Sequence, residues 1–355
     1  MNPAEKRRYD RHIRLPELGL KGQEAFGMFS VLVIGAGGLG CPALQYLAAA
    51  GIGKIGVVDM DMVDESNLQR QVLFGTEDLG KNKADCAIQK ISRLNPHIKT
   101  ASYPLRITEK NASEIISGYD AVMDGSDNFQ TRYLVSDVCV ILNKPLISGS
   151  VHKFEGQLSV FNYQGGPTYR CLYPAAGNLP SCSEAGILGV LTGTIGCMMA
   201  TELLKIASGL GEVLSGKLLV YNALDASSRI YSFETIPGNK QIKSIQPFEQ
   251  DCENNYSPEL NPSEFLESPD KEDFFVLDVR EEWEFTDENL KAVNIPLHSL
   301  TERILSIPHE RQVLICFQRG ARSKIAVQLL KENGYTNVAG LKGGLEAVLK
   351  YRQGR

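Results

Sequence analysis

The chain has 355 residues, of which 22% are charged, and its formal net charge is −5. This length favours two domains over a single core, and the absence of a positive balance argues against nucleic acid as a partner. The eight cysteines form no CxxC pair, and the opening run MNPAEKRRYDRHIRL has no apolar signal core, so we expect a cytoplasmic protein.

The stretch from Ser30 to Asp61 predicts a nucleotide-binding βαβ unit. Its apolar run 31–34 is β-branched and leads directly into glycines, as in a buried parallel strand. The glycine-rich turn 35–40 opens a helix with Pro42 near its start, and a second strand ends at Asp59. Glycines let the backbone approach a phosphate, a helix N-terminus attracts anions, and an acid at this place can accept hydrogen bonds from a ribose. The pattern does not say which nucleotide.

A polar segment, Asp61–Gln71, follows this unit. It places carboxamides, acids and a guanidinium beside the expected ribose site, and Arg70 suits the bidentate geometry of phosphate oxygens. Lys83 then begins a helix that we expect to end at Leu94, before an Asn-Pro pair. A nicotinamide-dependent dehydrogenase is one alternative, but that class does not use the polar segment or Lys83.

A third core strand, 121–123, leads into the polar turn Asp124–Asn128. The carboxyl end of such a strand borders the ligand crevice of an open α/β sheet, so Asp127 can reach a metal held by phosphates. A solvated turn is the alternative. A helix over 131–142 and a strand over 145–148 are expected to complete the parallel part of the sheet.

The pattern changes after this point. From Gly156 apolar and polar residues alternate, which predicts antiparallel strands added to the sheet. The irregular stretch 165–185 contains Cys171 and Cys182, and long loops of this kind are often functional. The charge-free run Ala185–Thr201 is interrupted by glycines and threonines, so we expect a buried helix and no membrane span.

Seven motifs in the first two thirds of the chain belong together. They are Gly35–Cys41, Asp59–Gln71, Lys83, Asn95–His97, Asp127–Asn128, Ser148–Gly149 and Glu155–Gln157. Together they resemble the MoeB/ThiF/HesA family, the bacterial relatives of ubiquitin-activating enzymes, over about residues 6–237. The resemblance implies a Rossmann-like mixed α/β sheet. It also implies an enzyme that uses ATP and Mg²⁺ to adenylate the C-terminal glycine of a ubiquitin-like sulfur carrier, MoaD or ThiS, ending in Gly-Gly. The product is converted to a thiocarboxylate for molybdopterin or thiazole synthesis.

The resemblance also implies roles for particular residues. Carried over by motif position, Asp59 holds the ribose, Gly38 lies against the nucleotide, Asp127 is the magnesium ligand, and Asn128 completes the nucleotide site. The phosphates are contacted by Asn67, Arg70 and Lys83. Arg11 is supplied across a homodimer interface, and a cysteine desulfurase is a candidate partner. The chemistry agrees, because an ionised carboxylate that attacks the α-phosphate needs cations and metal rather than a general base. A carrier-binding scaffold without catalysis is the second alternative.

The chain departs from the family at the zinc site. Relatives commonly hold a structural zinc with two CxxC pairs, but here the first pair reads Cys171-Leu172-Tyr173-Pro174 and the second, expected near 236–241, has no cysteine. One thiol cannot make a closed tetrahedral site, so we expect no structural zinc. Cys182 matches the cysteine that the family can use for thioester or persulfide chemistry. An unreactive loop thiol is the alternative, since adenylation needs no protein nucleophile.

The C-terminal part resembles a single rhodanese domain. A polar linker, 238–257, separates the expected domains 1–237 and 258–355. The matching motifs are Asp273–Arg280, Asn294–Leu297, Val313–Cys316, Arg319–Ser323 and Leu341–Gly344. A strand that runs into a compact Gly/Arg loop and then a helix can surround an anion, and a cysteine held there would have a lowered pKa.

The position of the catalytic cysteine is in doubt. Alignment on Gly320–Ser323 puts it at Phe317, which cannot carry a persulfide, and the nearest thiol, Cys316, lies one residue earlier. In a strand this shift turns the side chain to the opposite face. Either a longer loop wraps Cys316, or Cys316 is a core residue. We favour a weakened or absent thiosulfate sulfurtransferase activity and name Cys316 only as a candidate.

Overall fold

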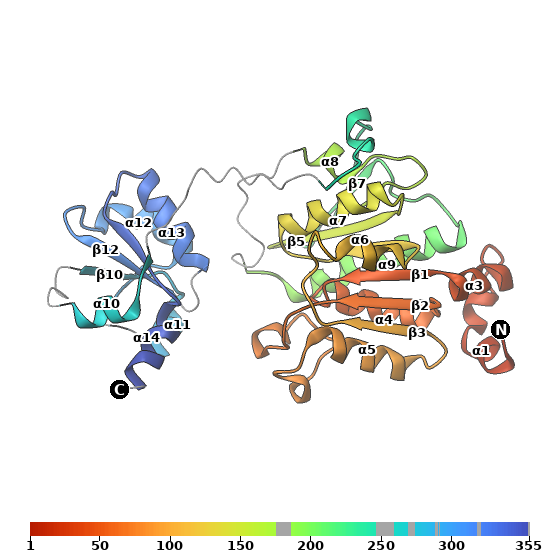
Figure 1. Ribbon diagram of the computed structural model, residues 1–355, viewed down its shortest axis with the longest axis horizontal. Coiled ribbons are helices and arrows are strands. Elements are labelled where there is room, and N and C mark those ends of the chain that lie inside the picture. The colour runs from red at the N-terminus through yellow and green to blue at the C-terminus, as the bar shows by residue number, and fades with distance from the viewer. Residues whose placement is uncertain are drawn as a thin grey trace. The chain divides into compact units, whose positions relative to one another are not determined.

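The computed structural model describes residues 1–174, 186–245, 259–268, 274–287, 290, 292–317 and 321–353. The chain divides into two compact units, Met1–Gln250 and Asp251–Arg355, each with its own sheet (Figure 1). The limits expected from the sequence, 1–237 and 258–355, stay a prediction.

The first unit is built on an eight-stranded sheet in the order β3-β2-β1-β4-β5-β6-β7-β8. The pairs from β3 to β5 are parallel, and those from β5 to β8 are antiparallel. The strands are β1 Ser30–Ile34, β2 Lys54–Val58, β3 Lys99–Tyr103, β4 Ala121–Asp124, β5 Leu146–His152, β6 Glu155–Phe161, β7 Lys217–Asn222 and β8 Ser227–Ser232. This confirms the predicted Rossmann-like mixed sheet.

Helices cover both faces of this sheet. They are α1 Pro3–Arg8, α2 Asp10–Ile13, α3 Gly19–Met28, α4 Gly40–Ala50, α5 Lys83–Leu94, α6 Ala112–Ser117, α7 Phe129–Ile141, α8 Tyr169–Leu172 and α9 Gly189–Ser208. Core residues of α4, α5 and α9 pack with one face of the central strands, and those of α6 and α7 pack with the other. The strand residues alternate between these two cores, as the pleat of a sheet requires.

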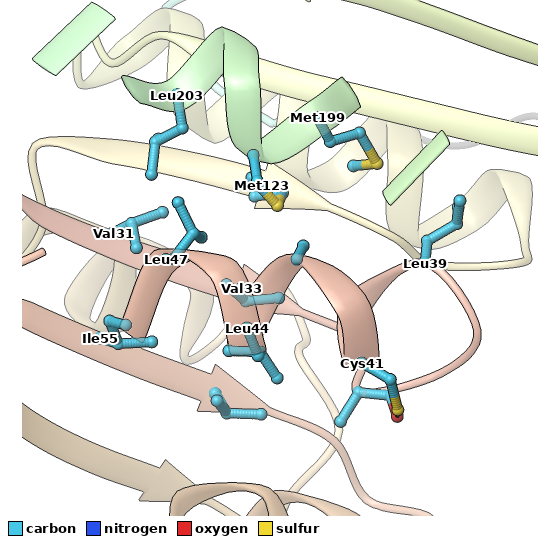
Figure 2. Close-up of a cluster of buried hydrophobic side chains, with 14 of the residues drawn as sticks. Val31, Val33, Leu39, Cys41, Leu44, Leu47, Ile55, Met123, Met199 and Leu203 are labelled. Atoms are coloured by element: carbon cyan, nitrogen blue, oxygen red, sulfur yellow. The ribbon is translucent and has the colours of Figure 1, made fainter. Parts of the chain in front are cut away.

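The larger core lies between α4, α9 and the central strands. Figure 2 shows Leu44 and Leu47 of α4 close to Val33 of β1, and Met199 and Leu203 of the neighbouring helix α9 in the same cluster. Of the described residues, only α9 forms a helix long and apolar enough to cross a membrane, and 44% of its most apolar window is buried. Because α9 packs against α4, β5 and β6, it is a core helix of this unit.

Local signals explain where the helices begin and end. The side chain of Asn82 caps α5 by accepting a hydrogen bond from the Asp85 N–H, and the Asn-Pro pair ends that helix at Leu94 as predicted. Asn128 caps α7 in the same way, so α7 begins at Phe129, two residues earlier than expected. β5 continues to His152, beyond the expected 145–148, because it pairs with β6 in a hairpin.

The second unit has a five-stranded sheet in the order β11-β10-β12-β13-β9, parallel throughout. Its strands are β9 Glu259–Leu260, β10 Phe274–Asp278, β11 Val293–Asn294, β12 Gln312–Cys316 and β13 Val338–Leu341. Its helices are α10 Pro262–Glu267, α11 Glu282–Asp287, α12 Leu300–Arg303, α13 Ala321–Glu332 and α14 Gly344–Gln353. Two apolar clusters, one on each face of the sheet, form its core.

Candidate active site

The turn between β1 and α4 packs so closely at two of its glycines that no side chain could be added there. Gly35 has a φ of 90°, and a Cβ there would lie 3.1 Å from the carbonyl oxygen of Gly125. A Cβ on Gly38 would lie 2.8 Å from Oγ1 of Thr192 in α9. Gly38 is therefore required by the packing of α9, whatever the ligand. The free N–H groups at the start of α4 suit an anion.

Asp59, directly after β2, is fastened to this turn. Its carboxylate accepts hydrogen bonds from the N–H of Ala36 at 2.8 Å and from the N–H of Asp61 at 2.9 Å. Burial raises the pKa of Asp59, while these backbone donors and Lys83 lower it. Each carboxylate oxygen has a second lone pair, so Asp59 can accept from a ribose hydroxyl while it holds the turn.

Lys83 brings a buried positive charge to the same edge of the sheet. It is the first residue of α5, and only 5% of it is exposed. Its Nζ lies 3.2 Å from Oδ2 of Asp61, whose side chain is 58% exposed. An anionic ligand can replace this counterion, because the Asp61 carboxylate can turn into water.

Asn67 and Arg70 lie in the segment between β2 and α5. The amide of Asn67 donates to Oγ of Ser66 at 3.2 Å, and Arg70 donates from Nη1 to the carbonyl of Ser66 at 3.1 Å. A Cβ added to Gly189, at the start of α9, would lie 2.5 Å from the carbonyl oxygen of Gln69 and 3.4 Å from Cβ of Arg70, so α9 packs closely on this segment. Both predicted phosphate contacts therefore lie on a folded segment that begins at Asp61, the partner of Lys83.

Asp127 and Asn128 lie on the neighbouring loop, after β4. Because β1 pairs in parallel with β2 on one side and β4 on the other, this loop meets the glycine turn where the strand order reverses. Asn128 accepts from the Thr131 N–H at 2.9 Å, and its amide nitrogen lies 3.5 Å from Oδ1 of Asp127. The exposed Asp127 carboxylate keeps lone pairs that can bind a cation.

Within the described part of the chain, no group of three or more His, Cys, Asp and Glu side chains could hold a metal ion. A cation at Asp127 would therefore need further oxygen ligands, which a polyphosphate supplies in nucleotide sites. The narrow turn, the buried ammonium of Lys83 and the exposed carboxylate of Asp127 fit ATP with Mg²⁺.

Arg11 lies near the amino-terminal ends of the parallel strands, whereas this site lies at their carboxyl ends. α2 follows Tyr9, whose ring fills the space beside Gly51 at the far end of α4. The 11 residues of α4 span about 16 Å, and the glycine turn lies at its other end. Figure 1 shows α1 and α3 near the start of β1, away from its arrowhead. The fold does not bring Arg11 to the pocket of its own chain.

Cys171 lies beside the segment in which the second cysteine pair of a zinc site would fall. Its Sγ accepts hydrogen bonds from the Ile236 N–H at 3.2 Å and from Nδ2 of Asn239 at 3.8 Å. Burial alone would raise the pKa of Cys171, but hydrogen bonds, including those from Thr168, Ile236 and Asn239, lower it. Cys182, the other thiol singled out in this region, lies outside the described residues.

Cys316, the last residue of β12, is fully buried. Its cluster contains Phe265, Leu314, Ala339, Leu341, Leu345 and Val348. Phe317 is buried in the other cluster, on the opposite face of the sheet. The pKa of Cys316 is raised to about 12, chiefly by burial and also by Asp278, while Arg280 lowers it. These surroundings favour the interpretation of Cys316 as a core residue. Residues 318–320 lie outside the described part of the loop.

The sequence patterns missed one well-placed group. Arg132 of α7 is 9% exposed, and it donates to the carbonyl of Ser126, next to Asp127. It also lines a small cavity with Ser148, Gln157, Tyr169 and Tyr173. The sequence signal that could have found it is an arginine in the first turn of a helix that follows an acidic loop.

Two family models match the chain: the ThiF family at residues 9–243 and the rhodanese-like domain at residues 261–351. The probable adenylyltransferase/sulfurtransferase MoeZ of Mycobacterium tuberculosis is 39% identical over 374 residues, which cover 99% of this chain and 95% of the relative. The sulfur carrier protein adenylyltransferase of Thermus thermophilus is 51% identical over 230 residues, 62% of this chain and 85% of the relative. The crystal structure of E. coli MccB with ATP shares the fold, with a TM-score of 0.58 at 21% identity over 66% of this chain and 73% of that one.

Proposed function

This chain belongs to the ThiF family and is one of its adenylyltransferases, with a rhodanese-like domain in its C-terminal part, and we propose that it activates a ubiquitin-like sulfur carrier protein. The reaction uses ATP and Mg²⁺ to join AMP to the C-terminal glycine of a carrier that ends in Gly-Gly. Pyrophosphate is released. Conversion of the acyl-adenylate to a thiocarboxylate then serves molybdopterin or thiamine thiazole synthesis.

One observation carries this proposal: the buried Lys83 is paired with the exposed Asp61, two residues after the Asp59 that holds the glycine turn in place. A dinucleotide site needs the turn and the acid but not a buried lysine whose partner, Asp61, is exposed. Such a lysine suits a ligand whose negative charge grows during the reaction, as it does in phosphoryl and nucleotidyl transfer.

Each residue of this candidate site has a separate role in adenylation. Asp59 holds the ribose, and the N–H groups of the glycine turn and Lys83 take phosphate oxygens. Asn67 and Arg70 bind the remaining phosphate oxygens, and Asp127 with Asn128 holds the metal side of the nucleotide. Magnesium, when bound, neutralises phosphate charge. The carrier's carboxylate is already ionised, so no general base is required.

We assign Arg11 to the ATP site of a second copy of the chain in a homodimer. Its position at the far end of α4 from its own glycine turn supports this assignment. Arg11 is exposed, and its guanidinium would meet phosphate oxygens bidentately. In a two-fold dimer each pocket would then receive one Arg11 from the other subunit.

The C-terminal domain has weakened or absent thiosulfate sulfurtransferase activity in this proposal, because Cys316 is buried in an apolar cluster. Cys182 is the remaining candidate for thioester or persulfide chemistry, with a cysteine desulfurase as the sulfur source. No structural zinc is needed, since hydrogen bonds to Cys171 already join its helix to residues 236–239. We place the protein in the cytoplasm.

ATP–pyrophosphate exchange with each purified carrier of the host tests the function. We expect exchange that requires Mg²⁺, the MoaD-like or ThiS-like carrier and its final glycine. The matched control is the same carrier without that glycine. Carrier binding without exchange would favour a scaffold over an enzyme.

A further inference from the structure

The loop that carries Asp127 is fixed by hydrogen bonds at both ends, while the Asp127 side chain is left exposed. The Ser126 N–H donates to Oδ1 of Asp124 at 2.9 Å, and the Thr131 N–H donates to Oδ1 of Asn128 at 2.9 Å. The contact between Asn128 and Oδ1 of Asp127 is long, at 3.5 Å. The orientation of the Asp127 carboxylate therefore depends mainly on the backbone before it.

Arg132 holds that backbone directly. Its Nε and Nη2 donate to the Ser126 carbonyl at 3.2 and 2.7 Å. This carbonyl belongs to the same rigid peptide unit as the N–H of Asp127. Two donors from one planar guanidinium fix that unit, and thereby the direction in which the Asp127 side chain leaves the backbone.

Arg132 also interacts with a buried acidic residue, Asp124, at the end of β4. Asp124 is 1% exposed, and its Oδ2 has no hydrogen-bond partner among the described residues. Burial raises the pKa of Asp124, while Arg132 and the Ser126 N–H lower it. Arg132 is therefore bonded to the Asp127 loop and close enough to the buried Asp124 to interact with its charge, and packing leaves Arg132 9% exposed.

We propose that Arg132 is a positioning residue for Asp127: it clamps the Ser126–Asp127 peptide so that the carboxylate faces the metal and phosphates. Arg132 does not touch the nucleotide in this scheme. The inference rests on the proposed function for the role of Asp127. Partners that orient a metal ligand typically contribute about 10–100-fold to metal affinity or activity.

The test compares Arg132→Lys and Arg132→Gln with Arg170→Lys. Arg170 is a matched control, because it is a partly buried arginine with a bidentate pair, to Asp137 at 2.8 and 2.9 Å, and its hydrogen bonds in the described part of the chain go to Asp137 rather than to the Asp127 loop. The primary readout is the dissociation constant of ATP with and without Mg²⁺, measured by calorimetry. Melting temperature and, in the exchange assay, the KM values for Mg²⁺ and carrier complete the set.

We expect both Arg132 variants to bind ATP without Mg²⁺ as the wild type does. The factor by which Mg²⁺ lowers the dissociation constant of ATP should fall about tenfold or more in these variants. The Arg170→Lys variant should have a lower melting temperature, but Mg²⁺ should strengthen its ATP binding as much as in the wild type. In an Asp127→Asn background, Arg132→Lys should have no further effect on Mg²⁺-dependent binding, since the two residues act through one contact.

Two results would overturn the inference. One is unchanged Mg²⁺-dependent ATP binding with a raised KM for the carrier. This result would indicate that Arg132 contributes to carrier binding through the small cavity that it lines. The other is an equal loss of the Mg²⁺ effect in the Arg132 and Arg170 variants, which would show a general structural role. The ATP-binding measurements with and without Mg²⁺ need no carrier, so they test the role of Arg132 even if no carrier supports exchange, and a failure of the proposed function is distinguishable.

Discussion

The glycine turn of the first unit and the end of β12 in the second both lie where a parallel strand meets a helix, and each has a buried chemical group beside it. Lys83 forms an ion pair with Asp61, whose side chain is 58% exposed, and its charge also acts on the neighbouring Asp59. Cys316 is enclosed by apolar side chains, and the nearby Asp278–Arg280 ion pair, with 2.8 Å between Nη2 and Oδ2, is itself buried.

The difference shows that burial can serve or disable a reactive group. Lys83 can exchange its counterion for a phosphate, since the exposed Asp61 side chain can move into water. Cys316 would have to lose a proton in a place where burial and Asp278 both raise its pKa. A thiolate is the reactive form of cysteine, so the second environment opposes chemistry that the first supports.

The largest effect is expected from the first of these groups. Lys83→Ala and Asp127→Ala should each lower pyrophosphate exchange at least about tenfold, because each removes a charge aimed at the phosphates. The melting temperature should change little for Asp127→Ala, whose side chain is exposed. Lys81→Ala, an exposed neighbour of Lys83, is the control and should exchange as the wild type does. Exchange at the wild-type rate in Lys83→Ala would show that Lys83 has no role in the mechanism, and the contrast between Lys83 and Cys316 would then be wrong.

Subunit mixing sharpens the assignment of Arg11. Arg11→Ala and Lys83→Ala proteins, each inactive alone, should recover about a quarter of wild-type exchange after random subunit exchange, because one site in each mixed two-fold dimer is intact. The measurement is the exchange rate against time of mixing. No recovery, once mixed dimers are shown by mass spectrometry, would count against a shared site.

Cysteine alkylation compares the thiols directly. Because burial raises the pKa of Cys316 to about 12, its thiol is protonated at pH 8, and its thiolate fraction should rise about tenfold per pH unit well below that value. Cys171, partly exposed and with a lowered pKa, should react with iodoacetamide before Cys316 in the native protein. Peptide mapping measures both rates. Faster labelling of Cys316 would mean that it is accessible and ionised.

Thiosulfate and cyanide test sulfur transfer by the second unit. We expect little thiocyanate, and no change in Cys316→Ser, because a protonated and enclosed thiol cannot attack thiosulfate. Robust production that Cys316→Ser abolishes would show that the longer loop works and that the core interpretation is wrong.

The smallest effect concerns metal. Purified protein should contain no stoichiometric zinc, and its melting temperature should be the same with and without chelator, because one thiol at Cys171 cannot close a tetrahedral site. Elemental analysis measures the zinc content. One zinc per chain would reveal ligands that the cysteine pattern does not contain.

The sequence by itself determined the features that depend on neighbours along the chain. The strand, glycine turn, helix and acid from Ser30 to Asp59 lie in the predicted order, and α5 runs from Lys83 to Leu94 as expected. These signals are local, since a cap, a proline or a run of β-branched residues acts on its own few residues. Strand β3, with its few apolar residues, gave no comparable signal and was missed.

Contacts between distant residues were decided only by the tertiary structure. Thr192 packs on Gly38, Asn239 binds Cys171, and Arg11 lies at the far end of α4 from its own glycine turn. No periodicity joins residues so far apart in sequence, because such contacts depend on how layers of helices and sheet pack after the local elements have formed. For the same reason the motif spacing at Phe317 raised the question of Cys316, but only the packing around β12 shows this thiol enclosed in a core.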